Sequence, residues 1–268
     1  MVKILLAAAF ALSALHAVAW TPPEKPDARE ILNGARDDRI AGRFEDALQK
    51  HIWFHREAIK HEPAMVGVRG SFAIADWAHL ASRYPPAMTA LLAERSTAAR
   101  EFSEGKDALD NFGDVAAIDR ALEEWTETYR LFVLLESRDE ALARRAYAYA
   151  QDALIEAKDF VRSARYMDPE RELRMLKEMQ ASIARSGRKP FPMEAEIMGR
   201  MEAERIGRVV AILVLGSRRE EAVRVAEKAR AEFKNDALPA VLVRSLEGQL
   251  PPPLFSKADG AAYKAVKP

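Results

Sequence analysis

The chain has 268 residues, and its 41 basic side chains balance its 41 acidic ones. Proteins that bind nucleic acid draw on an excess of basic side chains, so a net charge near zero argues against a nucleic-acid partner. The chain contains no cysteine, which excludes disulfides and cysteine-linked lipid anchors. A composition of 49% apolar and 31% charged residues is typical of a folded, water-exposed helical protein.

Residues 1–19 have the order of a secretory signal peptide. Lys3 precedes an apolar run over residues 4–12, and Ala17 and Ala19 then form an A-x-A cleavage site. We expect cleavage after Ala19 and export to a bacterial periplasm or the medium, because export without disulfides suits the bacterial envelope. The alternative is an uncleaved membrane anchor, which would need ~20 apolar residues. No membrane span is predicted after cleavage, since the most apolar later run, residues 209–215, is too short.

Helix-forming residues dominate from residue 27 to residue 248, so the sequence predicts an all-α fold. Three oxygen acceptors lie three residues before a glutamate, a spacing that caps helix starts: Asp27, Ser137 and Ser217. Asp168 followed by Pro169 predicts a further helix start. Pro85-Pro86 should end the helix that contains Trp77, because a proline excludes helical backbone in the residue before it.

A repeat-like spacing occurs in residues 77–84. Trp77, Leu80 and Tyr84 have the positions of the W-x2-L-G-x2-Y pattern, with Ala81 in place of the glycine. Four upstream residues have the order of a repeat's inter-helix turn, second helix and closing proline: Gly42, Phe44, Ala47 and Pro63. The chain therefore resembles the tetratricopeptide repeat (TPR) family. The resemblance implies a TPR-like α-α superhelix of about five helical hairpins, and a generic helical bundle is the alternative.

Composition along the chain predicts four parts: a signal peptide (1–19), TPR-like N-terminal hairpins (20–104), C-terminal hairpins (105–250) and a flexible tail (251–268). The internal boundary lies in residues 102–114. This stretch contains Gly105, Asn111 and Gly113 and is predicted to be a long connection that acts as a hinge. Residues 185–192 predict a shorter loop.

The N-terminal hairpin has an unusually long second helix. Pro63 follows Gly42 by 21 residues, four more than the repeat family usually shows. Four residues add one helical turn, so we expect this helix to project about 6 Å beyond its neighbours.

Two histidines lie four residues apart in this projecting turn. His51 and His55 belong to the apolar stripe that recurs at helical spacing from residue 44 to residue 59, which predicts that both point into the buried face. Such a pair can ligate one metal, with a third ligand from Glu57, Asp76 or His79 brought near by folding. The general-base glutamate of H-E-x-x-H enzymes is missing, and we favour a hydrogen-bonded structural pair. No metal or other cofactor is predicted.

Trp53 lies on the opposite side of this helix from the stripe, and Phe54 lies at its edge. Aromatic residues dominate interface hot spots, so Trp53 and Phe54, with His51 and His55 beside them, are the candidate partner-binding residues. The alternative is that adjacent hairpins bury both aromatic side chains as ordinary core.

The sequence contains no cysteine nucleophile, G-x-S-x-G elbow, phosphate-binding glycine loop or dinucleotide fingerprint. It therefore predicts a non-catalytic exported scaffold that binds a protein or peptide. Four alternatives stay open. The first is a helical protein that binds a metal or small ligand through His51 and His55, and the second is a cell-wall-related helical accessory protein. The third is a purely structural array that forms oligomers, and the fourth is a helical cell-wall-cleaving enzyme that uses a glutamate as its acid.

Overall fold

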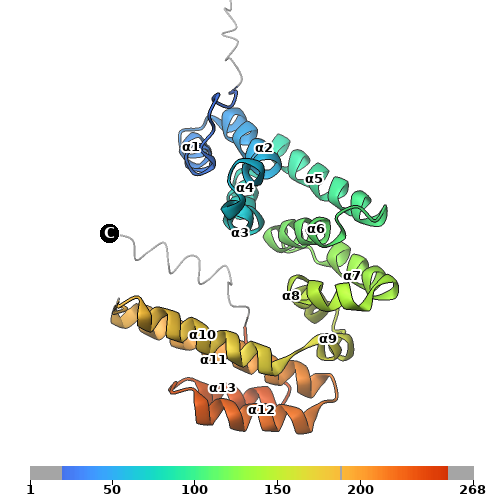
Figure 1. Cartoon of the computed structure of the whole chain (residues 1–268), viewed down its shortest axis with the longest axis vertical. Helices are drawn as coiled ribbons and strands as arrows, with labels where there is room; N and C mark the ends of the chain where they lie inside the picture. The colour runs from blue at the N-terminus through green and yellow to red at the C-terminus, as the bar shows by residue number, and fades with distance from the viewer. Residues whose placement is uncertain (1–19, 188, 253–268) are drawn as a thin grey trace, which may run out of the picture. The chain divides into compact units, whose positions relative to one another are not determined.

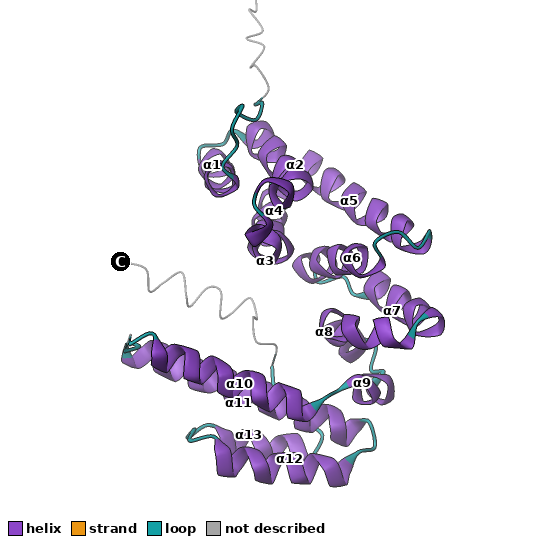
Figure 2. Ribbon diagram, viewed as in Figure 1, coloured by secondary structure: helices purple, strands orange, loops and turns teal. Residues whose placement is uncertain are grey.

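The computed structural model describes residues 20–187 and 189–252 (Figure 1). Within these ranges the regular structure is helical and contains no strand, which confirms the predicted all-α fold class (Figure 2). The predicted signal peptide lies outside the described residues, as do residues 253–268 of the predicted tail. None of the helices in the described ranges combines the length and apolar character that crossing a lipid bilayer requires.

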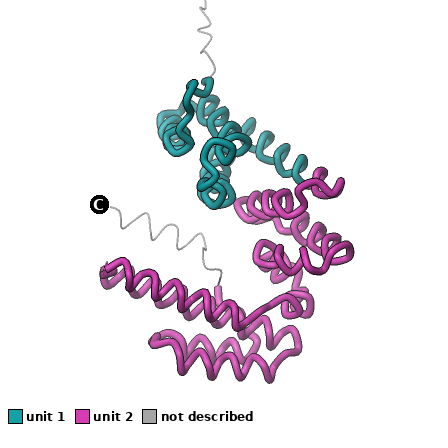
Figure 3. Tube along the Cα trace, in the orientation of Figure 1, with its two compact units in different colours: residues 1–98 teal, residues 99–268 magenta. Residues whose placement is uncertain are grey.

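The chain divides into two compact units, residues 1–98 and residues 99–268 (Figure 3). The division falls inside helix α5 (Pro85–Ser103). The sequence places a domain boundary six residues later, between residues 104 and 105.

The first unit is built around helix α2. Its described elements are α1 (Ala28–Ile40), α2 (Phe44–His61), the 3-10 turn η1 (Pro63–Met65), α3 (Val66–Val68), the π-helix η2 (Arg69–Ala73), α4 (Ile74–Ala81) and the start of α5. Helix α2 packs against α1, η1, η2 and α4. Helix α2 has 18 residues and α1 has 13. The extra turn relative to the repeat family stays a prediction.

Local signals explain how α1 and α2 pair. The Asp27 carboxylate accepts a hydrogen bond from the Glu30 amide, as the capping pattern predicts. Gly42 adopts a positive φ of 79°, which glycine tolerates best, and this turn reverses the chain. Alanines without exposed surface then line the contact between helices: Ala28, Ala35, Ala47 and Ala58. Small side chains at these positions allow the two helix axes to approach closely.

The segment between α2 and α4 changes helix type along its length. It passes from 3-10 geometry through one α turn into the π-helix of residues 69–73. Its Val66 and Phe72 side chains are exposed, with 68% of Phe72 accessible to solvent. Single-turn π segments are rare and occur frequently at functional sites. The segment from Pro63 to Ala73 is called the 63–73 segment below.

The second unit forms two groups of helices. Its described elements are α6 (Ala108–Leu122), α7 (Thr126–Arg138), α8 (Glu140–Glu156), α9 (Phe160–Tyr166), α10 (Pro169–Arg185), α11 (Pro192–Leu215), α12 (Arg219–Glu232) and α13 (Leu238–Leu246). Helices α6, α7 and α8 pack together, and α11 packs against α10, α12 and α13. Helix α9 contacts both α8 and α11 and so joins the two groups.

Two glycines permit the close packing of α11. A Cβ atom at Gly207 would lie 2.3 Å from Val241 Cγ1 on α13, and one at Gly216 would lie 2.2 Å from Ala164 Cβ on α9. Such distances are far below van der Waals contact, so any larger residue would force the helices apart.

Two of the predicted helix starts are wrong. Ser137 lies in the last turn of α7, where its hydroxyl donates to the Leu134 carbonyl, and Asp139 caps α8 instead. Ser217 has a positive φ of 64°, and α12 begins at residue 219 without a side-chain cap. Asp168 and Pro169 do start α10 as predicted. At Ser137 the cause is simple: a serine hydroxyl also bonds the carbonyl three or four residues back, so serine does not identify a cap by itself.

The predicted long connection over residues 102–114 is also wrong. Helix α5 runs to Ser103 and α6 starts at Ala108, so only residues 104–107 lie outside helices. Phe102 and Phe112 are buried with ring centroids 6.0 Å apart, and this contact holds the helix ends together despite Gly113 inside α6. The predicted stop before Pro85 and the predicted loop after Arg185 are confirmed.

Candidate functional site

The two histidines of α2 meet Trp77 of α4 inside the first unit. His51 is 2% exposed and His55 is 6% exposed, so the predicted burial of both side chains is confirmed. The His51 ring stacks on the Trp77 indole with centroids 5.9 Å apart, and the His55 ring meets it edge-on at 6.0 Å. These three residues are called the His–Trp cluster below.

Trp77 anchors this cluster to the next helix. Its indole is 1% exposed, and its Nε1 donates a 3.0 Å hydrogen bond to the Ala87 carbonyl of α5. Ala87 lies in the first turn of α5. The buried tryptophan therefore satisfies its only polar atom while it packs against α2.

His51 is unusual because it is buried without a polar partner. Neither of its ring nitrogens has a hydrogen-bond partner among the described residues. Burial, and then the positive charges of Arg36 and Arg39 on α1, lower the pKa of His51 from 6.5 to about 3. The predicted hydrogen-bonded pair is thus wrong for His51, because its neighbours are an aromatic ring and cations rather than acceptors.

His55 lies between opposite charges. The Arg69 side chain of η2 donates from Nε to the His55 carbonyl at 2.6 Å, and its Nη2 lies 3.5 Å from His55 Nε2. Glu94 of α5 lies 4.0 Å from the same ring nitrogen and also pairs with Arg56. Burial and Arg69 lower the pKa of His55 to about 4, although the Glu94 charge opposes this shift.

The arrangement does not resemble a metal centre. No group of three potential ligands from histidine, aspartate and glutamate side chains occurs among the described residues. Asp76, one of the third ligands considered from sequence, pairs with Arg36 at 2.6 Å, and Glu57 pairs with Lys60 at 2.8 Å. Both carboxylates therefore have other partners, and the Trp77 ring contacts both imidazoles.

The structure separates the two aromatic candidates. Phe54 has no exposed surface and belongs to a core cluster with Leu32 and Met65, so it contacts a partner only if α2 opens. Trp53 is partly buried against this cluster and stacks on His61 with ring centroids 5.7 Å apart. Of the four candidate partner-binding residues, Trp53 alone presents substantial surface in this conformation.

The repeat-motif residues come together in the first unit. Leu80 is buried beside Trp77, and the Tyr84 ring lies 5.8 Å from the Phe44 ring. The Tyr84 hydroxyl donates to Glu45 at 2.8 Å, which links the connection between α4 and α5 to the start of α2. Pro63 occupies the first position of η1, and Glu62 alone separates it from the end of α2.

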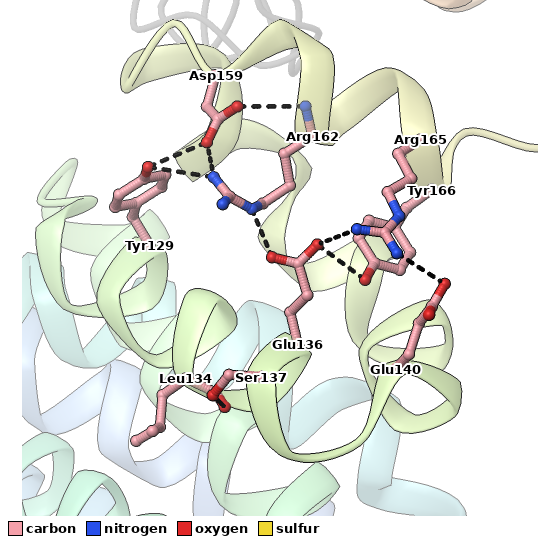
Figure 4. Close-up of polar contacts among 9 residues, drawn as sticks. All are labelled: Tyr129, Leu134, Glu136, Ser137, Glu140, Asp159, Arg162, Arg165 and Tyr166. Carbon is pink, nitrogen blue, oxygen red and sulfur yellow. Dashed lines mark hydrogen bonds and ion pairs between the residues drawn. The ribbon is translucent and has the colours of Figure 1, made fainter.

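A second polar cluster, in the other unit, was not found from sequence. Figure 4 shows Arg162 of α9 between Asp159 and Glu136, and its Nε donates to Glu136 at 2.7 Å. Tyr129 of α7 donates to Asp159 at 3.0 Å. Glu136 also accepts from the Tyr166 hydroxyl at 3.0 Å. These residues are called the Glu136 network below.

The Glu136 network fixes α9 against α7 and α8. Arg165 pairs with Glu136 and with Glu140, the first residue of α8. Burial and the hydrogen bond to Glu136 raise the pKa of Tyr166 to about 12. Each charged side chain of the network has an oppositely charged neighbour, which suits a structural role. The sequence gives little indication that these residues interact, because Glu136 lies 26 residues from Arg162 and 30 residues from Tyr166.

We expect Glu136→Gln to reduce stability modestly. The amide keeps the shape of the carboxylate but loses the charge that Arg162 and Arg165 share, so the free energy of unfolding should fall by about 1–2 kcal/mol. Urea unfolding followed by circular dichroism measures this change. Glu140→Gln is the matched control, because Glu140 is half exposed and should lose less than about 0.5 kcal/mol. Equal losses in the two variants would contradict the central role of Glu136.

Comparisons with known proteins add no relative, since no family model, curated protein or solved structure matches this chain. The resemblance to tetratricopeptide repeats therefore rests on the motif residues themselves. The functional interpretation rests on the geometry of the chain's own side chains.

Proposed function

We propose that this chain is an exported, TPR-like helical scaffold that binds a protein or peptide and carries no catalytic activity. The observation that carries the proposal is the meeting of the repeat-motif residues in the first unit. Trp77 and Leu80 are buried, Tyr84 packs on Phe44, and Gly42 forms the turn between helices. These are the roles that the family pattern gives to residues at these positions, and they support an array of hairpins as the architecture.

The 63–73 segment offers the most accessible apolar side chains near the predicted projecting turn. Val66 and Phe72 are exposed, whereas Phe54, His51 and His55 are buried. Exposed aromatic side chains are the usual anchors of a protein interface. We therefore propose Phe72 as the partner contact, with the partly exposed Trp53 on α2 as a second contact.

Cross-linking from single positions tests this contact. A photoreactive phenylalanine analogue at position 72 is expected to capture one discrete partner in cells that produce the protein. The same analogue at position 149 is the control, because Tyr149 is also an exposed aromatic residue but lies on α8 of the other unit. No product from position 72, or the same product from both positions, would contradict the proposed contact.

Export is tested separately. The proposal requires a mature chain that starts at Trp20, because Ala17 and Ala19 form the cleavage site. Intact mass measurement of protein recovered from the envelope fraction should show loss of residues 1–19. A full-length chain confined to the cytoplasm would contradict export but would leave the partner contact open to the cross-linking test.

A further inference from the structure

The His–Trp cluster holds two imidazoles in a place that suits only their neutral forms. A buried charge is costly unless it is paired and hydrogen-bonded. Neither ring nitrogen of His51 has an acceptor among the described residues, and the flat face of its ring lies on Trp77. A proton on this ring would therefore create a buried cation without a hydrogen-bond acceptor.

The charged groups around His51 oppose a second positive charge. Helix α1 contributes Arg36 and Arg39, whose charges already disfavour protonation of the ring. The Asp76 carboxylate of α4 is occupied by Arg36 at 2.6 Å. From α4 the ring also meets Trp77, which carries no charge. The Asp38 carboxylate of α1 is likewise engaged, because it pairs with Arg43 and Lys50. The charges that act on the His51 ring are those of Arg36 and Arg39, so both oppose its protonation.

Protonation of His55 would act on the 63–73 segment. Arg69 anchors that segment to α2 through the 2.6 Å bond to the His55 carbonyl, and its Nη2 is 3.5 Å from the His55 ring. A cationic ring at this distance repels the guanidinium. Glu94 of α5 is 4.0 Å from the ring but is shared with Arg56 of α2, so it compensates only part of the new charge.

We infer that the His–Trp cluster is an acid-sensitive device: uptake of protons by His51 and His55 breaks their packing on Trp77, displaces Arg69 and releases the 63–73 segment. The device needs no bound ligand and does not depend on the proposed partner. In the protonated state the first unit is open, and the π-helix η2 no longer contacts α2.

The direction and the pH range of the change in unfolding free energy follow from the pKa values of the two histidines in the folded and unfolded chain. Both histidines have folded-state pKa values, about 3 and about 4, below the ordinary 6.5. The unfolded chain therefore binds these protons more tightly, so the stabilisation is complete well above pH 6.5. It is lost as pH falls from 6.5 through about 4 for His55 and about 3 for His51. Between pH 7.5 and pH 5, the unfolding equilibrium constant should rise about 30-fold for each histidine, or on the order of 10³-fold for both.

Urea unfolding of the full chain at pH 7.5 and pH 5, followed by tryptophan fluorescence, tests this range. His51→Leu and His55→Leu should each remove about one 30-fold step from the pH dependence. His61→Gln is the matched control, because His61 is an exposed histidine at the end of the same helix. A pH dependence that is unchanged in both leucine variants would overturn the inference.

Two measurements on the unaltered chain keep the inference testable even if the leucine variants do not fold. Nuclear magnetic resonance of the imidazole signals should show His51 and His55 neutral in the folded chain down to pH 5. Hydrogen exchange, corrected for the intrinsic effect of pH, should show that residues 63–73 lose protection at pH 5 before α12 does. Titration of either ring near pH 6.5 in the folded state, or unchanged protection of residues 63–73, would overturn the inference.

Discussion

Trp77→Ala is expected to lower the free energy of unfolding by roughly 3 to 5 kcal/mol. The indole is almost fully buried, so its removal leaves a cavity between α2, α4 and α5. The substitution also removes the ring on which His51 stacks and leaves the Ala87 carbonyl without the indole donor. Urea unfolding of the full chain at pH 7.5 measures the loss.

Trp77→Phe separates the two contributions to this loss. Phenylalanine keeps an aromatic surface for His51 and His55 but cannot donate to Ala87, so we expect a smaller cost of about 1–2 kcal/mol. A loss below about 1 kcal/mol for Trp77→Ala would mean that the indole does not fill the core of the first unit. The same result would weaken the TPR-like interpretation, since the family pattern assigns this tryptophan to the hairpin core.

Gly207→Val should destabilise the second unit by about 3 kcal/mol. The first added atom alone would lie 2.3 Å from Val241 Cγ1 and 2.8 Å from the Ser245 hydroxyl. Both neighbours belong to α13, so relief of the overlap requires α11 and α13 to separate. Thermal unfolding followed by circular dichroism measures the effect.

Gly113→Ala provides the control of opposite sign. Gly113 is inside α6, and a Cβ atom there meets nothing within 4 Å. Alanine should therefore stabilise the protein by about 0.5–1 kcal/mol, because it loses less backbone entropy than glycine in a helix. If both substitutions changed stability in the same direction, close packing at Gly207 would not be the reason that the position holds glycine.

Much of the first unit could be predicted, because its helix boundaries and buried faces depend on residues that are close together in the sequence. The stripe from residue 44 to residue 59 correctly placed His51 and His55 on the buried face, and Trp77 is a core residue as its motif indicates. The Asp27 cap and the stop before Pro85 depend only on neighbouring residues, and both are confirmed. The same spacing could not show that His51 would lack an acceptor, because that depends on which side chains α1 and α4 present to it.

The errors occur where distant residues decide the outcome. Residues 102–114 contain two glycines, and their composition predicts a loop. The contact between Phe102 and Phe112 nevertheless keeps these two phenylalanines within helices α5 and α6. Phe54 was a candidate for partner binding, but packing against Leu32 and Met65 buries it. The Glu136 network could not be predicted for the same reason. Helical spacing considers each charged residue separately and predicts that its side chain is exposed to solvent.

The division into two units has a practical consequence for spectroscopy. Three of the four tryptophans, Trp20, Trp53 and Trp77, belong to residues 1–98, and only Trp125 belongs to residues 99–268. Intrinsic fluorescence therefore reports mainly on the first unit, whereas far-ultraviolet circular dichroism reports on the helices of both. If the two signals change at the same denaturant concentration, the chain unfolds cooperatively, and if they separate, the first unit has a stability of its own.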